Sequence, residues 1–160
     1  SRRAGTARAS CAAGGNRQVI ILDTNVLSAL MRAASEPAVV SWLDRQPVES
    51  IWITSITLFE TRFGLALLPR GRRRRALEAA FEQLLREDLE NRVLDFDGAA
   101  ATEAAALAAT RQRAGRSVDM RDTQIAGIAL ARRATLATRN LRHFQDSGVT
   151  LVDPWSGAAG

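Results

Sequence analysis

The composition describes one basic domain of ordinary apolar content. The chain has 160 residues, 46% of them apolar, which is enough to bury a core without disulfide or metal cross-links. Cys11 is the only cysteine and has no Cys or His partner in a metal-binding spacing, so neither a secreted disulfide scaffold nor a zinc site is indicated. All 22 basic residues are arginine against 17 acids, and the net charge of +5 favours an anionic partner, nucleic acid first. No apolar run approaches the roughly 20 residues of a membrane span, so we expect a cytoplasmic protein.

The first 17 residues differ from the rest of the chain. They contain four arginines, no acid and no apolar periodicity, so we expect a disordered N-terminal extension or an expression remnant over residues 1–17. A single domain is expected over residues 18–156, followed by a short C-terminal tail, residues 157–160.

Strand and helix patterns alternate from Val19 onward. The run VIILD is short, apolar and β-branched, which predicts a buried strand ending at Asp23, with Thr24 as the cap of the following helix. Further strands are predicted at IWIT, VLDF, TLAT and VTLV. Helices are predicted at about 37–45, 57–68, 72–92, 98–113 and 122–132. Strands that alternate with helices imply an α/β fold, in which a parallel sheet of about five strands is covered on both faces.

Three acids are expected at one edge of that sheet. Asp23 ends the first strand, Glu60 lies on the helix after the second, and Asp122 opens the helix that leads into TLAT. In an open α/β sheet, ligands bind beyond the carboxyl ends of the strands, where the strand order reverses. Because the chain contains no lysine to neutralise these acids, the cluster must bind a cation or become protonated.

The types of ligand indicate which metal ion binds, and the absence of certain residues excludes other catalytic mechanisms. Oxygen ligands without His or Cys select hard divalent ions, so Mg²⁺ or Mn²⁺ is expected rather than zinc or copper. Such an ion can orient a scissile phosphate and lower the pKa of an attacking water. His143 is the only histidine and has no Ser, Cys or second His in a recognisable spacing, which excludes two-histidine ribonuclease and Ser/His/Asp chemistry.

Three motifs occur in order: VIILDTNVLS, ITSITLFETRFGLALL and DTQIAGIALARRATLATRNLRHF, followed by a closing VDPW. Over roughly Val19 to Trp155 the chain therefore resembles the PIN-domain toxins of bacterial toxin–antitoxin systems, of the VapC and FitB type. The resemblance implies a PIN-like α/β/α sandwich and a toxic, Mg²⁺- or Mn²⁺-dependent endoribonuclease that hydrolyses phosphodiester bonds of single-stranded RNA. It also implies a homodimer, inhibition by a cognate antitoxin and a higher heteromeric complex with it.

The resemblance also assigns residues. Asp23, Glu60 and Asp122 match the family's catalytic and metal-binding acids, whereas its supporting polar positions fall on Thr24, Asn25, Thr138 and Asn140. Family members usually carry a fourth acid at the position of Asn140 or at that of His143, and neither residue here is acidic. Asp119, one helical turn before Asp122, is the first candidate for a further metal ligand, and Asp146 is the second.

Arginines and aromatic residues complete the set of candidates. Contacts to RNA or antitoxin are expected, on electrostatics alone, from Arg72, Arg73, Arg74 and Arg139, although a run of arginines at a helix start is typical of a solvated loop. Trp42 and Trp52 are expected in the core. Leu58, Phe59 and Phe63 are expected to bury the helix that carries Glu60.

Other functions fit the sequence less well. A phosphatase or phosphotransfer domain would need a second Asp at Asn25 or a lysine, and a dinucleotide-binding domain would need a glycine-rich turn where DTNVLS stands. The open alternative is a catalytically weakened PIN domain that acts as an RNA- or antitoxin-binding regulatory module, which the missing fourth acid supports.

The resemblance and the charges together predict a mode of control. We expect an antitoxin to place an arginine among Asp23, Glu60 and Asp122, because a planar guanidinium matches carboxylates in bidentate fashion. Its apolar face is expected to lie along the helix that contains Val39, Val40 and Leu43.

Overall fold

A computed structural model describes residues 18–32 and 34–157 of the chain. The expectations for residues 1–17, including Cys11, and for most of the C-terminal tail therefore lie outside the described residues. The described residues form five strands: β1 (Ile20–Leu22), β2 (Ile51–Thr54), β3 (Val93–Leu94), β4 (Thr135–Ala137) and β5 (Thr150–Val152). The α-helices are α1 (Thr24–Met31), α2 (Pro37–Asp44), α3 (Ser55–Leu67), α4 (Arg72–Gln83), α5 (Gly98–Arg113) and α6 (Met120–Arg132). Shorter turns are η1 (Val48–Ser50), η2 (Leu84–Asp88) and η3 (Leu141–His143).

The strands form one parallel sheet in the order β3-β2-β1-β4-β5. Ile20 of β1 pairs with Ile51 on one side and with Thr135 on the other, so β1 lies at the centre. The chain moves outward from β1 through β2 to β3, crosses back, and continues from β4 to β5. The strand order therefore reverses between β1 and β4, which is where a ligand site is expected in such a sheet.

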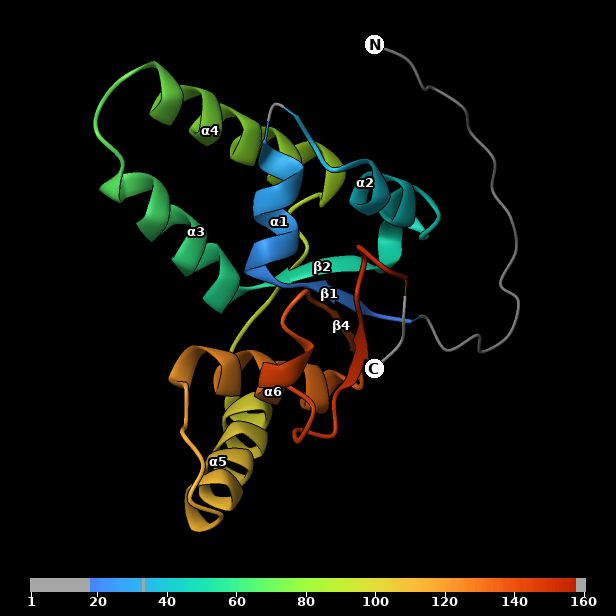
Figure 1. The fold of residues 1–160 in the computed structure, drawn as a ribbon, viewed down its shortest axis with the longest axis vertical. Coiled ribbons are helices and arrows are strands. Elements are labelled where there is room, and N and C mark those ends of the chain that lie inside the picture. The colour runs from blue at the N-terminus through green and yellow to red at the C-terminus, as the bar shows by residue number, and fades with distance from the viewer. Residues whose placement is uncertain (1–17, 33, 158–160) are drawn as a thin grey trace.

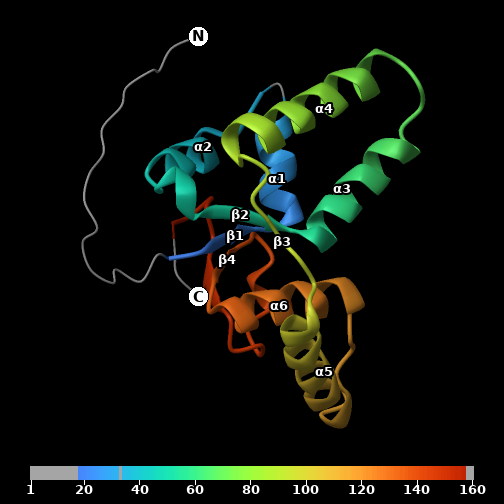
Figure 2. The same cartoon turned by 180° about the vertical axis from the view of Figure 1, so that it is seen from behind.

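Helices cover both faces of the sheet, as predicted. Figures 1 and 2 show α1 to α4 on one face and α5 with α6 on the other. The first face buries a cluster that includes Leu27, Trp42 and Phe81, and the second buries a cluster that includes Ile128 and Phe144. None of the helices in the described part of the chain is both long and apolar enough to cross a membrane.

The α5–α6 contact is unusually close because Gly127 faces α5. A Cβ atom at this position would lie 2.5 Å from the carbonyl oxygen of Ala100 and 2.7 Å from Cβ of Ala104. Contacts that short do not occur, so the absence of a side chain at Gly127 sets the distance between the two helices. This packing fixes the start of α6, which carries Asp122.

Several predicted boundaries move in the structure. Asp23, not Thr24, is the cap of α1, since its carboxylate accepts the N–H of Thr24. Helix α3 begins at Ser55, two residues before the predicted start, because Thr54 caps it. Helix α4 ends at Gln83 and continues only as the π-helical turn η2, so it stops before residue 92.

The aromatic residues next to Glu60 do not pack in the core. Phe59 and Phe63 are 63% and 49% exposed, and their rings stack on each other with centroids 5.9 Å apart. The prediction that both bury α3 is therefore wrong, although Leu58 is partly buried. Trp42 is buried as predicted, whereas Trp52 is only half-buried.

Candidate functional site

Asp23 is held in a buried corner where β1 and β4 end side by side. The N–H of Asp23 donates to the carbonyl oxygen of Ala137, which ties the two strand ends together (2.9 Å). Its carboxylate accepts a hydrogen bond from the Thr138 hydroxyl (2.7 Å) and from the N–H of Thr24 (2.8 Å). The residue is only 5% exposed. Sheet geometry and three fixed partners thus set the position of this carboxylate.

Asn25 and Thr138 extend the corner into a network. The Asn25 amide donates to Asp23 Oδ2 (3.4 Å) and to Thr138 Oγ1 (3.3 Å), and its oxygen accepts the N–H of Arg139 (3.2 Å). Asn140 enters only through its backbone N–H, which donates to Thr138 Oγ1 (3.0 Å). The network positions the Asp23 carboxylate and leaves the exposed Asn140 side chain outside it.

Glu60 lies on α3, opposite the start of α6, and its side chain is 18% exposed. Arg121 places its guanidinium 3.6 Å from a carboxylate oxygen of Glu60. The chain has no lysine for this role, but an arginine neutralises part of the charge at Glu60. The spacing along the chain gives no sign that residues 60 and 121 face each other.

Asp122 lies within the first turn of α6 and contacts the only histidine. Nδ1 of His143 is 3.0 Å from Oδ2 of Asp122, whose side chain is 23% exposed. Asp122 is not the cap of the helix, because Asp119 takes that role and accepts the N–H of Asp122 (2.9 Å). The His143 ring thus orients the Asp122 carboxylate, and Asp119 fixes the backbone at the start of α6.

The three acids affect one another electrostatically. Burial raises the pKa of the Asp23 carboxyl, and the Asp122 carboxylate raises it further, while the Thr138 hydrogen bond opposes the rise. Burial also raises the pKa of Glu60, which Arg121 counteracts and the carboxylates of Asp23, Asp122 and Asp119 increase. The pKa of Asp122 is raised by burial and by Asp119. The cluster is therefore short of positive charge.

The donor set fits a hard divalent ion better than any other group. It offers carboxylate oxygens, and the buried hydroxyl of Thr24, next to Asp23, has no hydrogen-bond partner. Within residues 18–32 and 34–157, no three His, Cys, Asp or Glu side chains form a ready-made metal site. Instead, Glu60 contacts Arg121 and Asp122 contacts His143. To bind a metal ion, the Glu60 and Asp122 side chains would have to turn away from these two partners.

The remaining candidates divide between structural contacts and exposed surface. Asp146 is not available as a metal ligand because Arg111 and Arg116 both bind its carboxylate. Arg139 stacks its guanidinium over Trp155, 4.8 Å from the ring centroid. Arg74 pairs with Glu78.

Two exposed arginines, Arg72 and Arg73, lie in the first turn of α4 and not in a loop. Arg73 lines a groove of about 300 Å³ that also contains Glu60. Contacts from Arg72, Arg73, Arg74 and Arg139 to RNA or antitoxin stay predictions.

Comparison with known proteins identifies the family of this chain. Residues 20–147 match the PIN domain family. Among curated proteins, the chain is 37% identical over 140 residues to VapC ribonuclease Y4jK of Sinorhizobium fredii, which covers 88% of this chain and all of the relative. It is 33% identical to toxin FitB of Neisseria gonorrhoeae, over 86% of this chain and 99% of FitB. The chain belongs to the PIN-domain family, among proteins of the VapC and FitB type.

Solved structures of this family have the same fold. The crystal structure of FitAcB from Neisseria gonorrhoeae superposes with a TM-score of 0.78 at 33% identity and covers 86% of this chain and 99% of that one. A structure of FitAB bound to an IR36 DNA fragment gives a TM-score of 0.77 at 33% identity, over 86% and 96% of the two chains. The PIN-like α/β/α fold predicted from the motifs is thus confirmed.

Proposed function

We propose that this PIN domain is a toxic, metal-dependent endoribonuclease that hydrolyses phosphodiester bonds in single-stranded RNA. The observation that carries the proposal is the convergence of Asp23, Glu60 and Asp122 at the reversal point of the sheet. The similarity along the whole length of a VapC ribonuclease supports RNA as the substrate. The oxygen-only donor set supports Mg²⁺ or Mn²⁺ as the cofactor.

Each residue of the site has a distinct task in this proposal. Asp23, Glu60 and Asp122 would hold the ion, with Asp119 as a further candidate ligand. When bound there, a divalent ion orients the scissile phosphate and activates water. Thr138 and Asn25 fix the Asp23 carboxylate through hydrogen bonds of 2.7 and 3.4 Å.

Two further side chains act beside the ligands. His143 orients Asp122, and its half-exposed ring lies on the open side of the site. Arg121 balances the charge of Glu60 when no divalent ion is present. Since no side chain here is a suitable nucleophile, we infer that water attacks the phosphorus atom directly.

Cleavage under chelation and metal add-back tests the proposal. Purified protein free of antitoxin should cut a single-stranded RNA with Mg²⁺ or Mn²⁺, should stop with EDTA, and should resume when metal is restored. Asp23→Asn, prepared in parallel, should be inactive while melting cooperatively, because Asn keeps the shape of the buried side chain and removes its charge. Full binding of RNA without cleavage by the wild type would favour the alternative, a catalytically weakened regulatory module.

An antitoxin is the proposed inhibitor. The FitAB relatives support a protein partner, and the Arg121–Glu60 contact supports the idea that the acids accept a guanidinium. Part of the predicted binding mode is wrong, because Val39 on α2 is fully buried and cannot contact a partner. We propose instead that the apolar segment enters the groove of about 300 Å³ that Met31, Leu65 and Leu77 line and that reaches Glu60. Replacing the antitoxin's inserted arginine by alanine should restore cleavage more than it weakens binding.

The homodimer remains a prediction, and the exposed apolar stripe on α3 supports a place for it. Phe59, Phe63 and Leu67 lie four residues apart along the helix and are 63%, 49% and 69% exposed. A second copy can cover such a stripe with the same stripe about a two-fold axis. Phe63→Ser should therefore convert a dimer into a monomer in light scattering, and a monomeric wild type would contradict the proposal.

A further inference from the structure

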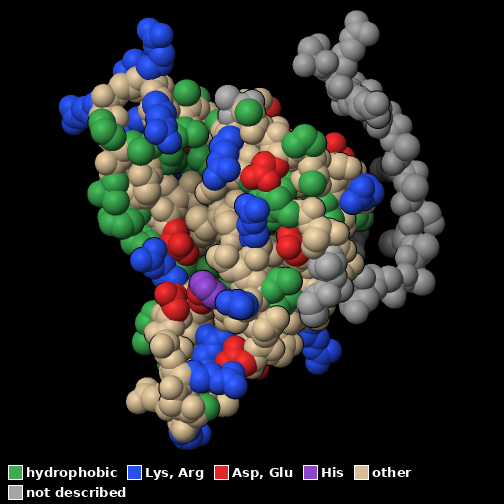
Figure 3. Space-filling model, viewed as in Figure 1, with side chains coloured by type: hydrophobic (Ala, Val, Ile, Leu, Met, Phe, Trp, Pro, Cys, Tyr) green, Lys and Arg blue, Asp and Glu red, His purple; other side chains and the backbone are tan. Residues whose placement is uncertain are grey.

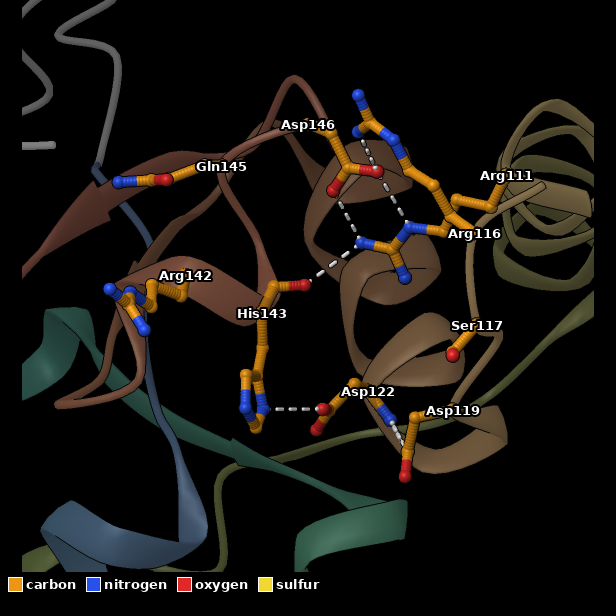
Figure 4. A pocket seen from close by; sticks show the side chains of 9 residues that line it. All are labelled: Arg111, Arg116, Ser117, Asp119, Asp122, Arg142, His143, Gln145 and Asp146. Carbon is orange, nitrogen blue, oxygen red and sulfur yellow. Dashed lines mark hydrogen bonds and ion pairs between the residues drawn. The ribbon is translucent and has the colours of Figure 1, made fainter. Parts of the chain in front are cut away.

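A second cavity adjoins the acid cluster on the α5–α6 face. It has a volume of about 370 Å³ and shares Asp122 and His143 with the site. Figure 4 shows Asp122 beside the ring of His143, and Asp146 farther along the cavity, near the backbone carbonyl of His143, with Arg111 and Arg116 converging on it. Figure 3 shows acidic and basic side chains gathered close together around the single histidine. The cavity thus has an acidic wall next to the catalytic acids and a basic wall farther away.

The basic wall is built on a buried arginine. Arg111, 6% exposed, donates two hydrogen bonds to Asp146 (3.1 and 2.9 Å), one to Thr123 (3.2 Å) and one to the carbonyl oxygen of His143 (2.9 Å). These bonds lower the pKa of the Asp146 carboxyl, so this acid stays ionised and is neutralised by Arg111. Arg111 therefore ties the end of α5 to the segment that carries His143.

Two positive charges on this wall are left without an acid of their own. Arg116 also bonds to Asp146 (3.0 Å), but Arg111 already balances that carboxylate, and the Arg116 side chain is 61% exposed. Among the described residues, no hydrogen bond or ion pair engages the guanidinium of Arg142, which is exposed at the rim. The wall therefore has an excess of two exposed guanidinium groups.

We propose that this cavity, the Arg111 pocket, seats one nucleotide of the RNA next to the scissile bond. In this arrangement Arg116 and Arg142 bind the phosphate next to the scissile one. The inference rests on the proposed function, because it places the second phosphate relative to the acid cluster. A pocket of several hundred cubic ångströms is the size that small ligands occupy. Single-stranded RNA offers an unpaired base for the cavity and a neighbouring phosphate for the two arginines.

The composition of the pocket favours RNA over an acidic protein segment. Its acidic wall, Asp119 and Asp122, repels phosphates and carboxylates alike until a divalent ion is held at Asp122, so charge alone does not distinguish the two partners. The exposed ring of His143 offers a surface on which an unpaired base stacks, and an acidic peptide has no base to place there.

The test compares paired arginine variants in cleavage and in binding. Arg116→Gln with Arg142→Gln should raise KM for a single-stranded RNA about tenfold while kcat changes little, because both arginines bind the phosphate equally in the ground state and in the transition state. On the inactive Asp23→Asn background, the association constant K of a labelled RNA should depend less steeply on salt. The negative slope of log K against log salt should shrink in magnitude by about 0.7 for each phosphate that the protein no longer neutralises. Arg113→Gln removes the same charge from an exposed position that does not line the pocket and should leave both values unchanged.

Three outcomes would overturn the inference. The first is an unchanged KM and salt slope in the double variant while the wild type cuts RNA. The second is an equal effect of Arg113→Gln, which would mean that only net charge matters. The third is unchanged RNA binding with weakened antitoxin binding, which would assign the pocket to the protein partner. A wild type that cuts no RNA would instead refute the proposed function itself. Mn²⁺ affinity, measured by calorimetry, should stay the same in the double variant, because no metal ligand is altered.

Discussion

Two charged groups near His143 have opposite electrostatics: the acid cluster at its ring, and Asp146 with its arginines near its carbonyl oxygen. The acid cluster, Asp23, Glu60 and Asp122, is crowded, and the pKa of each member is raised, with burial as the largest cause. Asp146, in contrast, is clamped between Arg111 and Arg116, and its pKa is lowered. Carboxylates thus have two different roles in this protein. A carboxylate with its own arginines stabilises the fold, whereas carboxylates that share too little positive charge are prepared to bind a cation.

Substitutions in the two groups should separate activity from stability most sharply. Asp122→Asn should lower kcat by about 100-fold or more, because even residues that merely support a metal ligand change activity by roughly 10- to 100-fold. Asp146→Asn should lower kcat by less than about tenfold, since Asp146 contacts no proposed ligand. The measurement is initial-rate cleavage of one RNA at saturating Mg²⁺. Equal reductions in the two variants would contradict the division.

The free energy of unfolding should be affected more by Asp146→Asn than by Asp122→Asn, the reverse of the order for activity. Asp146→Asn removes the charge that Arg111 binds, and a buried arginine without its carboxylate should cost about 2 kcal/mol of unfolding free energy. Asp122→Asn should leave the metal-free protein as stable as the wild type or more so, because it relieves repulsion with Asp119. Urea unfolding in EDTA checks both. Asp44→Asn, an exposed acid on α2, is the matched control.

The pH dependence of stability should have opposite signs for the two groups. The acid cluster binds protons more tightly when folded, so without metal its contribution falls as pH rises above the ordinary pKa values of 3.8 for Asp and 4.5 for Glu toward the raised ones. Asp146 binds its proton less tightly when folded, so its contribution is complete above pH 3.8 and disappears only as pH falls through its lowered pKa.

Metal should reverse the first trend, because only the ionised acids bind it. Unfolding in EDTA should therefore show stability that declines from about pH 3.8 upward, and Mg²⁺ should remove the decline. Asp88 also has a raised pKa, so the informative quantity is the difference between wild type and Asp23→Asn. An identical slope in these two proteins would show that Asp23 does not titrate with the cluster.

The smallest predicted effect concerns Arg121. Its guanidinium lies 3.6 Å from Glu60 and competes with a divalent ion for the same carboxylate. Arg121→Gln should therefore tighten Mn²⁺ binding by about threefold. This change in affinity corresponds to the free energy that an exposed ion pair typically contributes. Arg133→Gln, exposed at the end of α6, is the control for net charge. Weaker Mn²⁺ binding in Arg121→Gln would mean that Arg121 helps to form the site.

The sequence predicts the sheet and the corner around Asp23 well, because both depend on short-range patterns. An apolar run that ends in Asp23, and a second that leads to Thr138, must end side by side once β1 and β4 pair. The partners of Glu60 and Asp122 could not be predicted, since Arg121 and His143 reach them across helices whose rotation no local pattern fixes. Phe59 and Phe63 were misplaced for the same reason: an apolar pair on a helix does not reveal whether it faces the core or a partner.

Calorimetric titration of Mn²⁺ tests the central claim most directly. The wild type should bind Mn²⁺ with release of protons from the acid cluster at mildly acidic pH, and Asp146→Asn should bind it equally well. Asp23→Asn and Asp122→Asn should each bind at least about tenfold more weakly. Wild-type affinity for Mn²⁺ in both of these variants would contradict the account, because the three acids would then not be the place where the protein holds its metal.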